Sequence, residues 1–110
     1  MEIVNVNDFK KDDKDIINMM VLFDKQYEGG KFCRFGKVII PSGAKIPESG
    51  LTKHDANEFS IIIKGEVDVT CEGKTLHAST GMAMCIPMNE EHKTANNSDE
   101  DCEIIWALVK

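Results

Sequence analysis

Residues 54–65 read HDANEFSIIIKG, in which a histidine and a glutamate precede a β-rich run that ends at a glycine. Apart from one serine, residues 59–63 are aromatic or β-branched, so the segment 58–63 predicts a strand. Imidazole and carboxylate groups are common ligands of divalent transition metals. The stretch therefore places two candidate metal ligands, His54 and Glu58, at the start of a strand.

A second constellation lies downstream and runs from Gly81 through Pro87, Asn89 and His92 to Asn96. It adds one imidazole to the two candidate ligands upstream. Two histidines and one glutamate on strand-like segments form a ligand set for one divalent transition metal.

Short β-rich runs separated by turn residues continue along the chain. They are 3–6, 16–23, 32–40, 58–63, 66–71, 75–78, 83–86, 93–95 and 102–109. A helix at 16–26 is the alternative for the second run. Pro41-Ser42-Gly43 predicts a turn with proline at its second position, and Lys64-Gly65 predicts a hairpin or a tight bend. The series of short strands predicts an all-β sandwich or closed barrel.

Length and charge limit the classes of protein that fit. With 110 residues, 42% apolar and 29% charged, the chain predicts one globular domain over 1–110. The net charge of −6, without a basic cluster, disfavours nucleic acid and anionic membranes as partners. No apolar run approaches the roughly 20 residues of a spanning helix, and no secretory signal is recognisable, so a cytoplasmic location is expected.

The first constellation resembles the first motif of the cupin superfamily, Gly-x(5)-His-x-His-x(3,4)-Glu-x(6)-Gly. His54, Glu58 and Gly65 keep its spacing. Thr52 stands where the first histidine of the motif is usual, and Ile46 stands where the leading glycine is usual. One ligand of the usual four is therefore missing, because a neutral hydroxyl is a weak donor compared with imidazole.

The second constellation resembles the second cupin motif, Gly-x(5)-Pro-x-Gly-x(2)-His-x(3)-Asn. Gly81, Pro87, His92 and Asn96 keep the spacing throughout. Asn89 stands where the motif has its second glycine, and asparagine also tolerates a left-handed backbone.

The resemblance implies a small single-domain cupin, an all-β double-stranded β-helix or jelly-roll barrel. Residues 38–109 would form the barrel and 1–30 would supply N-terminal strands. Cupins are commonly dimers, so the resemblance also implies a homodimer in which the N-terminal strands add to the neighbour's sheet. An immunoglobulin-like sandwich is the competing fold, and it would hold His54 and His92 more than about 8 Å apart, too far for one metal.

Alternation along a strand places further residues around the predicted site. If Glu58 points into the barrel, Ser60 and Ile62 share its face and line the pocket. Thr52 and Trp106 are further candidates for the pocket wall. Asp55, next to His54, is expected on the opposite face, and His77 and Cys85 receive no metal-binding role.

The predicted function is metal-dependent chemistry on a small polar metabolite, of isomerase, lyase, decarboxylase or dioxygenase type. Zinc, iron, manganese or nickel fits a ligand set of His54, Glu58 and His92, and the loss at Thr52 leaves a metal-free site possible. The alternative is a non-catalytic module that binds or senses a small ligand with a degenerate or empty metal site. Whether the chain is an enzyme is left open by these residues.

Overall fold

The structure, a computed structural model, describes residues 1–110, and its regular structure consists of antiparallel strands and two single 3-10 turns. The strands are β1 (Asn18–Tyr27), β2 (Lys31–Ile40), β3 (Lys45–Ile46), β4 (Asn57–Lys64), β5 (Glu66–Cys71), β6 (Lys74–Ser79), β7 (Ala83–Ile86), β8 (His92–Ala95) and β9 (Cys102–Val109). The 3-10 turns are η1 (Val6–Asp8) and η2 (Glu28–Gly30). No helix is long and apolar enough to cross a membrane.

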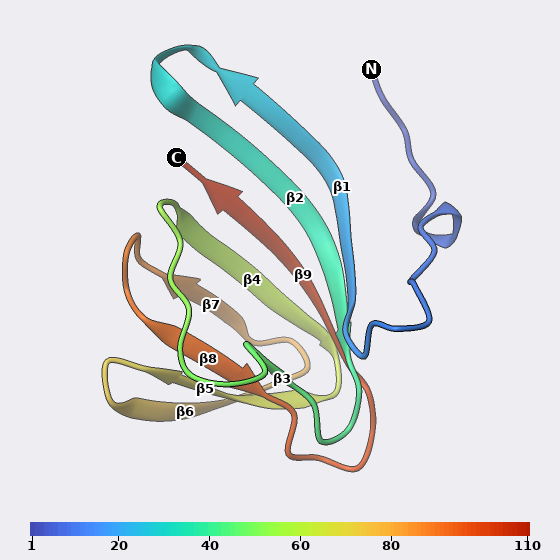
Figure 1. Ribbon diagram of the computed structural model, residues 1–110, viewed down its shortest axis with the longest axis vertical. Coiled ribbons are helices and arrows are strands. Elements are labelled where there is room, and N and C mark those ends of the chain that lie inside the picture. Colours follow the sequence, from blue (N-terminus) through green and yellow to red (C-terminus); the bar gives the residue numbers. More distant parts are fainter.

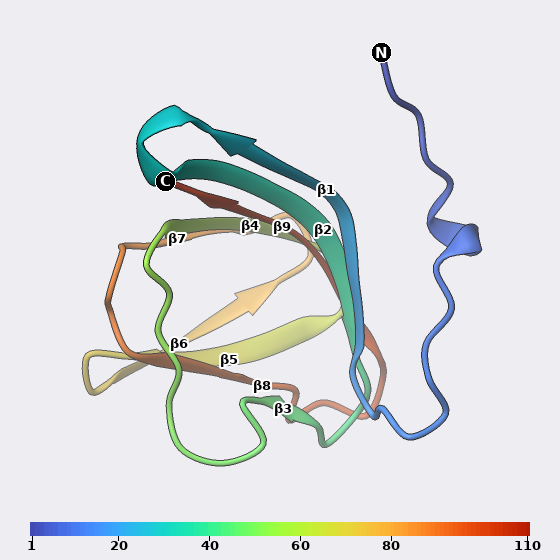
Figure 2. The ribbon, with the colours of Figure 1, turned by 45° about the horizontal axis from the view of Figure 1, so that its top comes forward.

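The strands form two sheets that face each other. A five-stranded sheet has the order β1-β2-β9-β4-β7, and a four-stranded sheet has the order β3-β8-β5-β6. Figure 1 shows the strands, and Figure 2 shows the two sheets as separate layers with the N-terminal segment beside β1. This arrangement confirms the predicted all-β jelly roll.

Alternation along the strands builds the core between the sheets. On β9, Cys102, Ile104 and Trp106 are buried, whereas the residues between them are only half-buried. Ile62 on β4 and Val67 on β5 are each 1% exposed and pack from opposite sheets into the same cluster. Burial of such side chains is the main favourable term in folding, so the alternating pattern selects both the strands and their inward faces.

The N-terminal part differs from its prediction. Residues 3–6 do not form a strand: Ile3 is 86% exposed, and the Asn5 side chain accepts a hydrogen bond from the Asn7 N–H at the start of η1. A short β-rich run becomes a strand only where it pairs with a sheet edge, and residues 3–6 pair with neither sheet. The run at 16–23 is a strand rather than the alternative helix, but it begins at Asn18 and extends to Tyr27 because it forms a hairpin with β2.

Two turns are refined by the structure. Pro41 is the first residue of its turn, because its carbonyl accepts the Ala44 N–H at 3.0 Å, and the prediction of proline at the second position is wrong. Lys64-Gly65 is a tight bend between β4 and β5, which belong to different sheets, and not a hairpin. A Cβ at Gly65 would lie 2.5 Å from the Asp101 carbonyl oxygen, so only glycine fits this crossing.

Candidate metal centre

A cavity of about 200 Å³ lies between the two sheets and is lined from both. Its lining residues are Met19, Val38, Ile40, Ile46, Pro47, Thr52, His54, Glu58, Ser60, Met84, His92, Thr94, Ile104, Trp106 and Leu108. Most of its wall is apolar, and its histidine and carboxylate groups come from the two sequence constellations. This combination of an apolar wall and a few polar groups is typical of small-molecule sites.

His54, Glu58 and His92 converge in this cavity. The His54 Nε2 lies 3.5 Å from Glu58 Oε1, and the His92 Nε2 lies 3.9 Å from Glu58 Oε2. One ligand atom from each residue lies within 4.8 Å of the other two. Ligands held at about 2.1 Å around one tetrahedral metal lie about 3.4 Å apart, so the cluster needs only small adjustments to accept an ion.

The two imidazole rings are close neighbours, with centroids 5.2 Å apart and planes inclined by 50°. The competing immunoglobulin-like sandwich would have separated them by more than about 8 Å. The rings instead share one interior, as the barrel prediction requires.

His92 is held in an orientation suited to a ligand. It opens β8, is 4% exposed, and its Nδ1 lies 2.9 Å from the Glu90 carbonyl oxygen. A carbonyl can only accept, so Nδ1 carries a proton, and Nε2, which lies on the side of Glu58, is the nitrogen left to bind a metal. This type of hydrogen bond fixes the tautomer of metal-binding histidines.

The turn of the second constellation is hydrogen-bonded to the segment that carries His54. The Asn89 N–H donates to the His54 carbonyl at 2.7 Å, and the Met88 N–H donates to the Asn57 side-chain oxygen at 2.9 Å. Asn89 has φ +65°, the left-handed conformation expected of the residue that replaces glycine in this motif. Backbone contacts between the two constellations thus set the distance between their ligands.

Thr52 lies beside His92 and faces the same cavity. The two residues form an isolated antiparallel bridge, and directly opposed residues in such a bridge present their side chains on the same face. The position of the usual imidazole is thus occupied by a short hydroxyl side chain. The ligand cluster is open on this side.

Of the other predicted pocket residues, two line the cavity and one does not. Ser60 and Trp106 line the cavity, whereas Ile62, two residues beyond Ser60 on the same face, packs in the core below it. Thr94 and Met84 were missed, although Thr94 follows His92 by one alternation and Met84 faces Ser60 across β4 and β7. Alternation along the strand from His92 would have predicted Thr94 as a lining residue.

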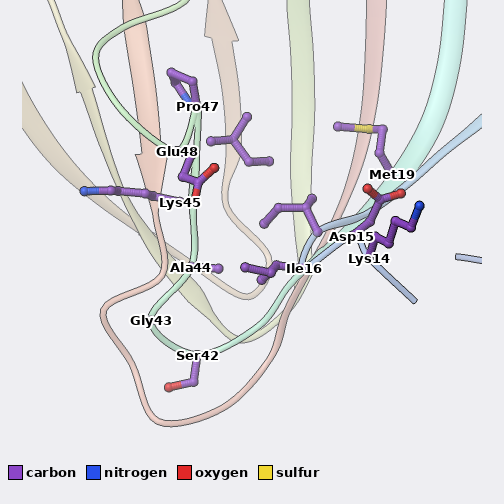
Figure 3. A pocket seen from close by; sticks show the side chains of 12 residues that line it. Lys14, Asp15, Ile16, Met19, Ser42, Gly43, Ala44, Lys45, Pro47 and Glu48 are labelled. Atoms are coloured by element: carbon purple, nitrogen blue, oxygen red, sulfur yellow. The ribbon is translucent and has the colours of Figure 1, made fainter. Parts of the chain in front are cut away.

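Three further lining residues, Met19, Ile46 and Pro47, were not predicted from the sequence, although Ile46 occupies the leading-glycine position of the first motif. They also border a second, wider depression of about 910 Å³ between the N-terminal segment and β3, shown in Figure 3. Its charged side chains, such as Lys14 and Glu48, come from the rim, and no set of ligating groups converges there.

Groups expected outside the site lie outside it. Asp55 points to the surface and lies 3.3 Å from Lys110, and Cys85 is exposed on β7. His77 is hydrogen-bonded to Asp68 at 2.8 Å, which raises the pKa of the imidazole. This ion pair is separate from the cavity, so it competes with none of the candidate ligands.

Comparison with known proteins agrees with this geometry. A family model described as "Cupin domain" matches residues 36–108, which includes both constellations. No curated protein matches the chain.

Solved structures share the fold at low sequence identity. The Thermus thermophilus protein TT1209 is 15% identical with a TM-score of 0.77, and the match covers 99% of this chain and 97% of that one. The cupin domain of Schizosaccharomyces pombe Cnp3 is 18% identical with a TM-score of 0.72, covering 87% of this chain and 66% of that one. The Cupin_2 domain of an XRE family transcriptional regulator from Enterobacter cloacae is 18% identical with a TM-score of 0.70, covering 86% and 96%. With its two motifs, its jelly-roll sheets and the family match over residues 36–108, the chain belongs to the cupin family.

Proposed function

We propose that this small cupin barrel binds one divalent transition metal through His54, Glu58 and His92 and acts on a small polar metabolite. The observation that carries the proposal is the convergence of one ligand atom from each residue within 4.8 Å inside a cavity. Two imidazoles and one carboxylate suit zinc or non-haem iron, and manganese and nickel accept the same donors.

The residues around such a metal site would have different roles. His54, Glu58 and His92 would hold the ion, the Glu58 carboxylate would neutralise one of its two charges, and the open side at Thr52 would leave room for a metabolite oxygen. When bound, the metal would supply a Lewis acid that polarises that oxygen. Isomerase, lyase and decarboxylase chemistry would use this polarisation, whereas dioxygenase chemistry would need a redox-active ion such as iron.

Metal analysis of single variants tests the proposal. Protein purified without added metal and then loaded with zinc should hold about one ion per chain, and His54→Ala, Glu58→Gln and His92→Ala should each lose more than about nine-tenths of it, since three ligands are the minimum for a tight site. Asp55→Asn and His77→Ala, which alter groups outside the cavity, are the matched controls. Unchanged zinc content in His92→Ala would refute the proposal.

A second function, ligand binding without turnover, is favoured by Thr52. The hydroxyl at this position removes a usual ligand, and a cupin domain of similar fold is part of a transcriptional regulator. A ligand that binds only the native state raises the melting temperature. Stabilisation by a small organic acid that persists in excess chelator would favour this module over the metal-dependent enzyme.

We also propose a homodimer that forms through the outer face of the five-stranded sheet. One row across this face is apolar on every strand, because Phe23, Phe35, Ala107, Phe59 and Cys85 are successive cross-strand partners. Phe35 and Phe59 are 38% and 46% exposed. The charges beside them, Lys37 and Glu103, pair at 2.7 Å, so a second copy meets a neutral apolar surface.

Light scattering on Phe59→Lys tests the dimer. The change should produce a monomer with an unchanged circular dichroism spectrum, because a charge on this face opposes self-association but leaves the core intact. Leu76→Lys, an exposed residue on β6 of the other sheet, is the control. A wild-type monomer at micromolar concentration would contradict the proposal.

The proposed site of action is the cytoplasm. The four cysteines are all free thiols, which suits a reducing compartment. Fractionation of cells that express the tagged chain tests this location.

A further inference from the structure

Two hydroxyl side chains lie in the cavity one alternation beyond the ligand cluster. Ser60 follows Glu58 by two residues on β4, and Thr94 follows His92 by two residues on β8. All four side chains line the same cavity, and Figure 2 shows β4 and β8 in opposite layers. Because alternate residues on a strand lie about 7 Å apart, the hydroxyls form a second polar row below the ligands.

This second row is the inner end of the cavity. The next inward residues along the two strands are Ile62, which is 1% exposed, and Asn96, which is fully buried. Neither of them lines the cavity. A ligand that enters past the metal would therefore end against the hydroxyls.

Both hydroxyls are unpaired and open to the cavity. Trp106 Nε1 is the only fully buried side-chain nitrogen or oxygen without a hydrogen-bond partner. The hydroxyls of Ser60 and Thr94 have no partner in the chain either, so their oxygen atoms are not enclosed. Both residues are half-buried and line the cavity from the inner faces of their strands, so the open surface of each hydroxyl lies within it.

The side chains beside the hydroxyls are apolar or offer no strong acceptor. The cross-strand neighbours of Ser60 are Trp106 and Met84, and Thr94 pairs with an isoleucine on β3 and a valine on β5. A hydroxyl in an apolar wall is costly unless it forms a hydrogen bond. The pair therefore indicates a polar atom on the ligand at this depth.

The charges of the wall restrict what the ligand can carry. No lysine or arginine lines the cavity. A divalent ion held by Glu58 would keep one positive charge, which a single carboxylate on the ligand balances. A phosphate or a second carboxylate would bring a further charge against a wall that has no cation for it.

We propose that Ser60 and Thr94 bind the hydroxyl group of a small monocarboxylate, whose carboxylate binds the metal at the open side near Thr52. The inference rests on the proposed metal site. A chain of three or four carbon atoms spans the step of about 7 Å between the two polar rows. The cavity volume of about 200 Å³ suits a molecule of this size. The two hydroxyls thus select among carboxylates by an oxygen that the metal does not bind.

Calorimetry with two acids of equal size tests the proposal. 4-Hydroxybutanoate and pentanoate differ only at the end of the chain, where the first has a hydroxyl and the second a methyl group. The zinc-loaded wild type should bind 4-hydroxybutanoate about three- to tenfold more tightly, as one or two neutral hydrogen bonds allow. A purely apolar wall would bury the hydroxyl unpaired, so tighter binding of pentanoate overturns the proposal.

Removal of the two hydroxyls should reverse the preference. A protein carrying Ser60→Ala and Thr94→Val should bind pentanoate more tightly than 4-hydroxybutanoate. Thr75→Val is the matched control, because the Thr75 hydroxyl is exposed and bonded to Thr70, and it should keep the wild-type preference. A preference for the hydroxy acid that persists in the folded double variant also overturns the proposal.

Succinate tests the limit of one charge. It has a carboxylate in place of the hydroxymethyl group of 4-hydroxybutanoate, and it should bind at least about tenfold more weakly, since no cation meets its second charge. Equal binding of the two would overturn the assignment of a monocarboxylate.

The outcomes separate this proposal from the metal site. Zinc binding without binding of 4-hydroxybutanoate refutes the ligand class and leaves the metal site intact. If zinc does not bind, the same titrations in chelator decide: a preference for 4-hydroxybutanoate that the double variant loses supports the hydroxyl pair, and equal binding of the two acids by the wild type refutes it.

Discussion

Thr52 and His92 exchange both of their backbone hydrogen bonds, with N···O distances of 2.9 Å and 2.8 Å. Thr52 belongs to the segment before β4 and His92 to β8, so this bridge ties the two cupin motifs together beside the cavity. Opposed residues in a hydrogen-bonded pair have Cα atoms about 5.5 Å apart and side chains on one face. A longer side chain at position 52 would therefore reach the ligand cluster.

Thr52→His is expected to bind zinc at least tenfold more tightly, a gain of about 1.4 kcal/mol, because it adds an imidazole to the open side of the cluster. Competition with a chromogenic chelator measures the change. Lys53→His, one residue away and exposed, is the matched control and should not tighten binding. Equal affinity in Thr52→His and the wild type would mean that position 52 does not face the metal.

Asn89→Gly is expected to keep zinc affinity, because glycine adopts the φ of +65° found here without strain. Asn89→Val should lower stability by about 1–2 kcal/mol, since a β-branched residue disfavours the left-handed region. Chemical denaturation and zinc titration of both variants make the comparison. Equal stability of the two would show that the turn has another conformation.

Asn96→Ala is expected to destabilise the fold by about 2–4 kcal/mol. The buried amide donates to the carbonyls of Ile40 and Glu100, both at 2.8 Å, and accepts from Ser98. Removing it leaves the Ile40 carbonyl in the core without this donor. Urea unfolding measures the loss, and Asn97→Ala, whose side chain binds Asp68 at the surface, should cost far less.

His77 is expected to titrate above the ordinary value of 6.5, because its hydrogen bond to Asp68 raises the pKa of the imidazole. The stabilisation from His77 is complete below 6.5 and is lost as the pH rises through the raised pKa. Bonds from Asn97 and then His77 lower the pKa of Asp68, whose contribution is present above 3.8 and is lost as the pH falls through the lowered value.

The ring proton signal of His77 reports this titration by magnetic resonance. Asp68→Asn should move the midpoint down toward 6.5, although Glu66, 3.8 Å from Nε2, remains. Asp13→Asn, at the exposed N-terminal segment, should leave it in place. A midpoint that does not respond to Asp68→Asn would exclude the ion pair.

Cys102 is expected to resist alkylation while Cys85 reacts. Burial, with Glu103 and Glu66 nearby, raises the pKa of the Cys102 thiol to about 11, and the side chain is fully buried. The thiolate is the reactive form, so iodoacetamide at about pH 8 should label exposed Cys85 first. Peptide mass spectrometry locates the label, and comparable labelling of Cys102 in the folded protein would contradict its burial.

The spacing of the motif residues predicted that His54, Glu58 and His92 would converge, because a jelly roll brings the same two segments together whenever their spacing is kept. Local alternation also predicted the bounds of β7, residues 83–86. Sequence could not predict that residues 3–6 lack a strand, since that depends on which chain segment occupies the sheet edge. Nor could it predict that the indole ring of Trp106 packs closely over Gly36, which lies on a strand far away in sequence.

The bend at Gly65 has a mechanical consequence for the metal centre. Because the chain changes sheets there, Glu58 belongs to the five-stranded layer and His92 to the four-stranded layer. An ion held by both residues would link the two sheets and resist their separation. Any change that loosens the packing between them, even at a distant core residue such as Val67, would then release metal more easily.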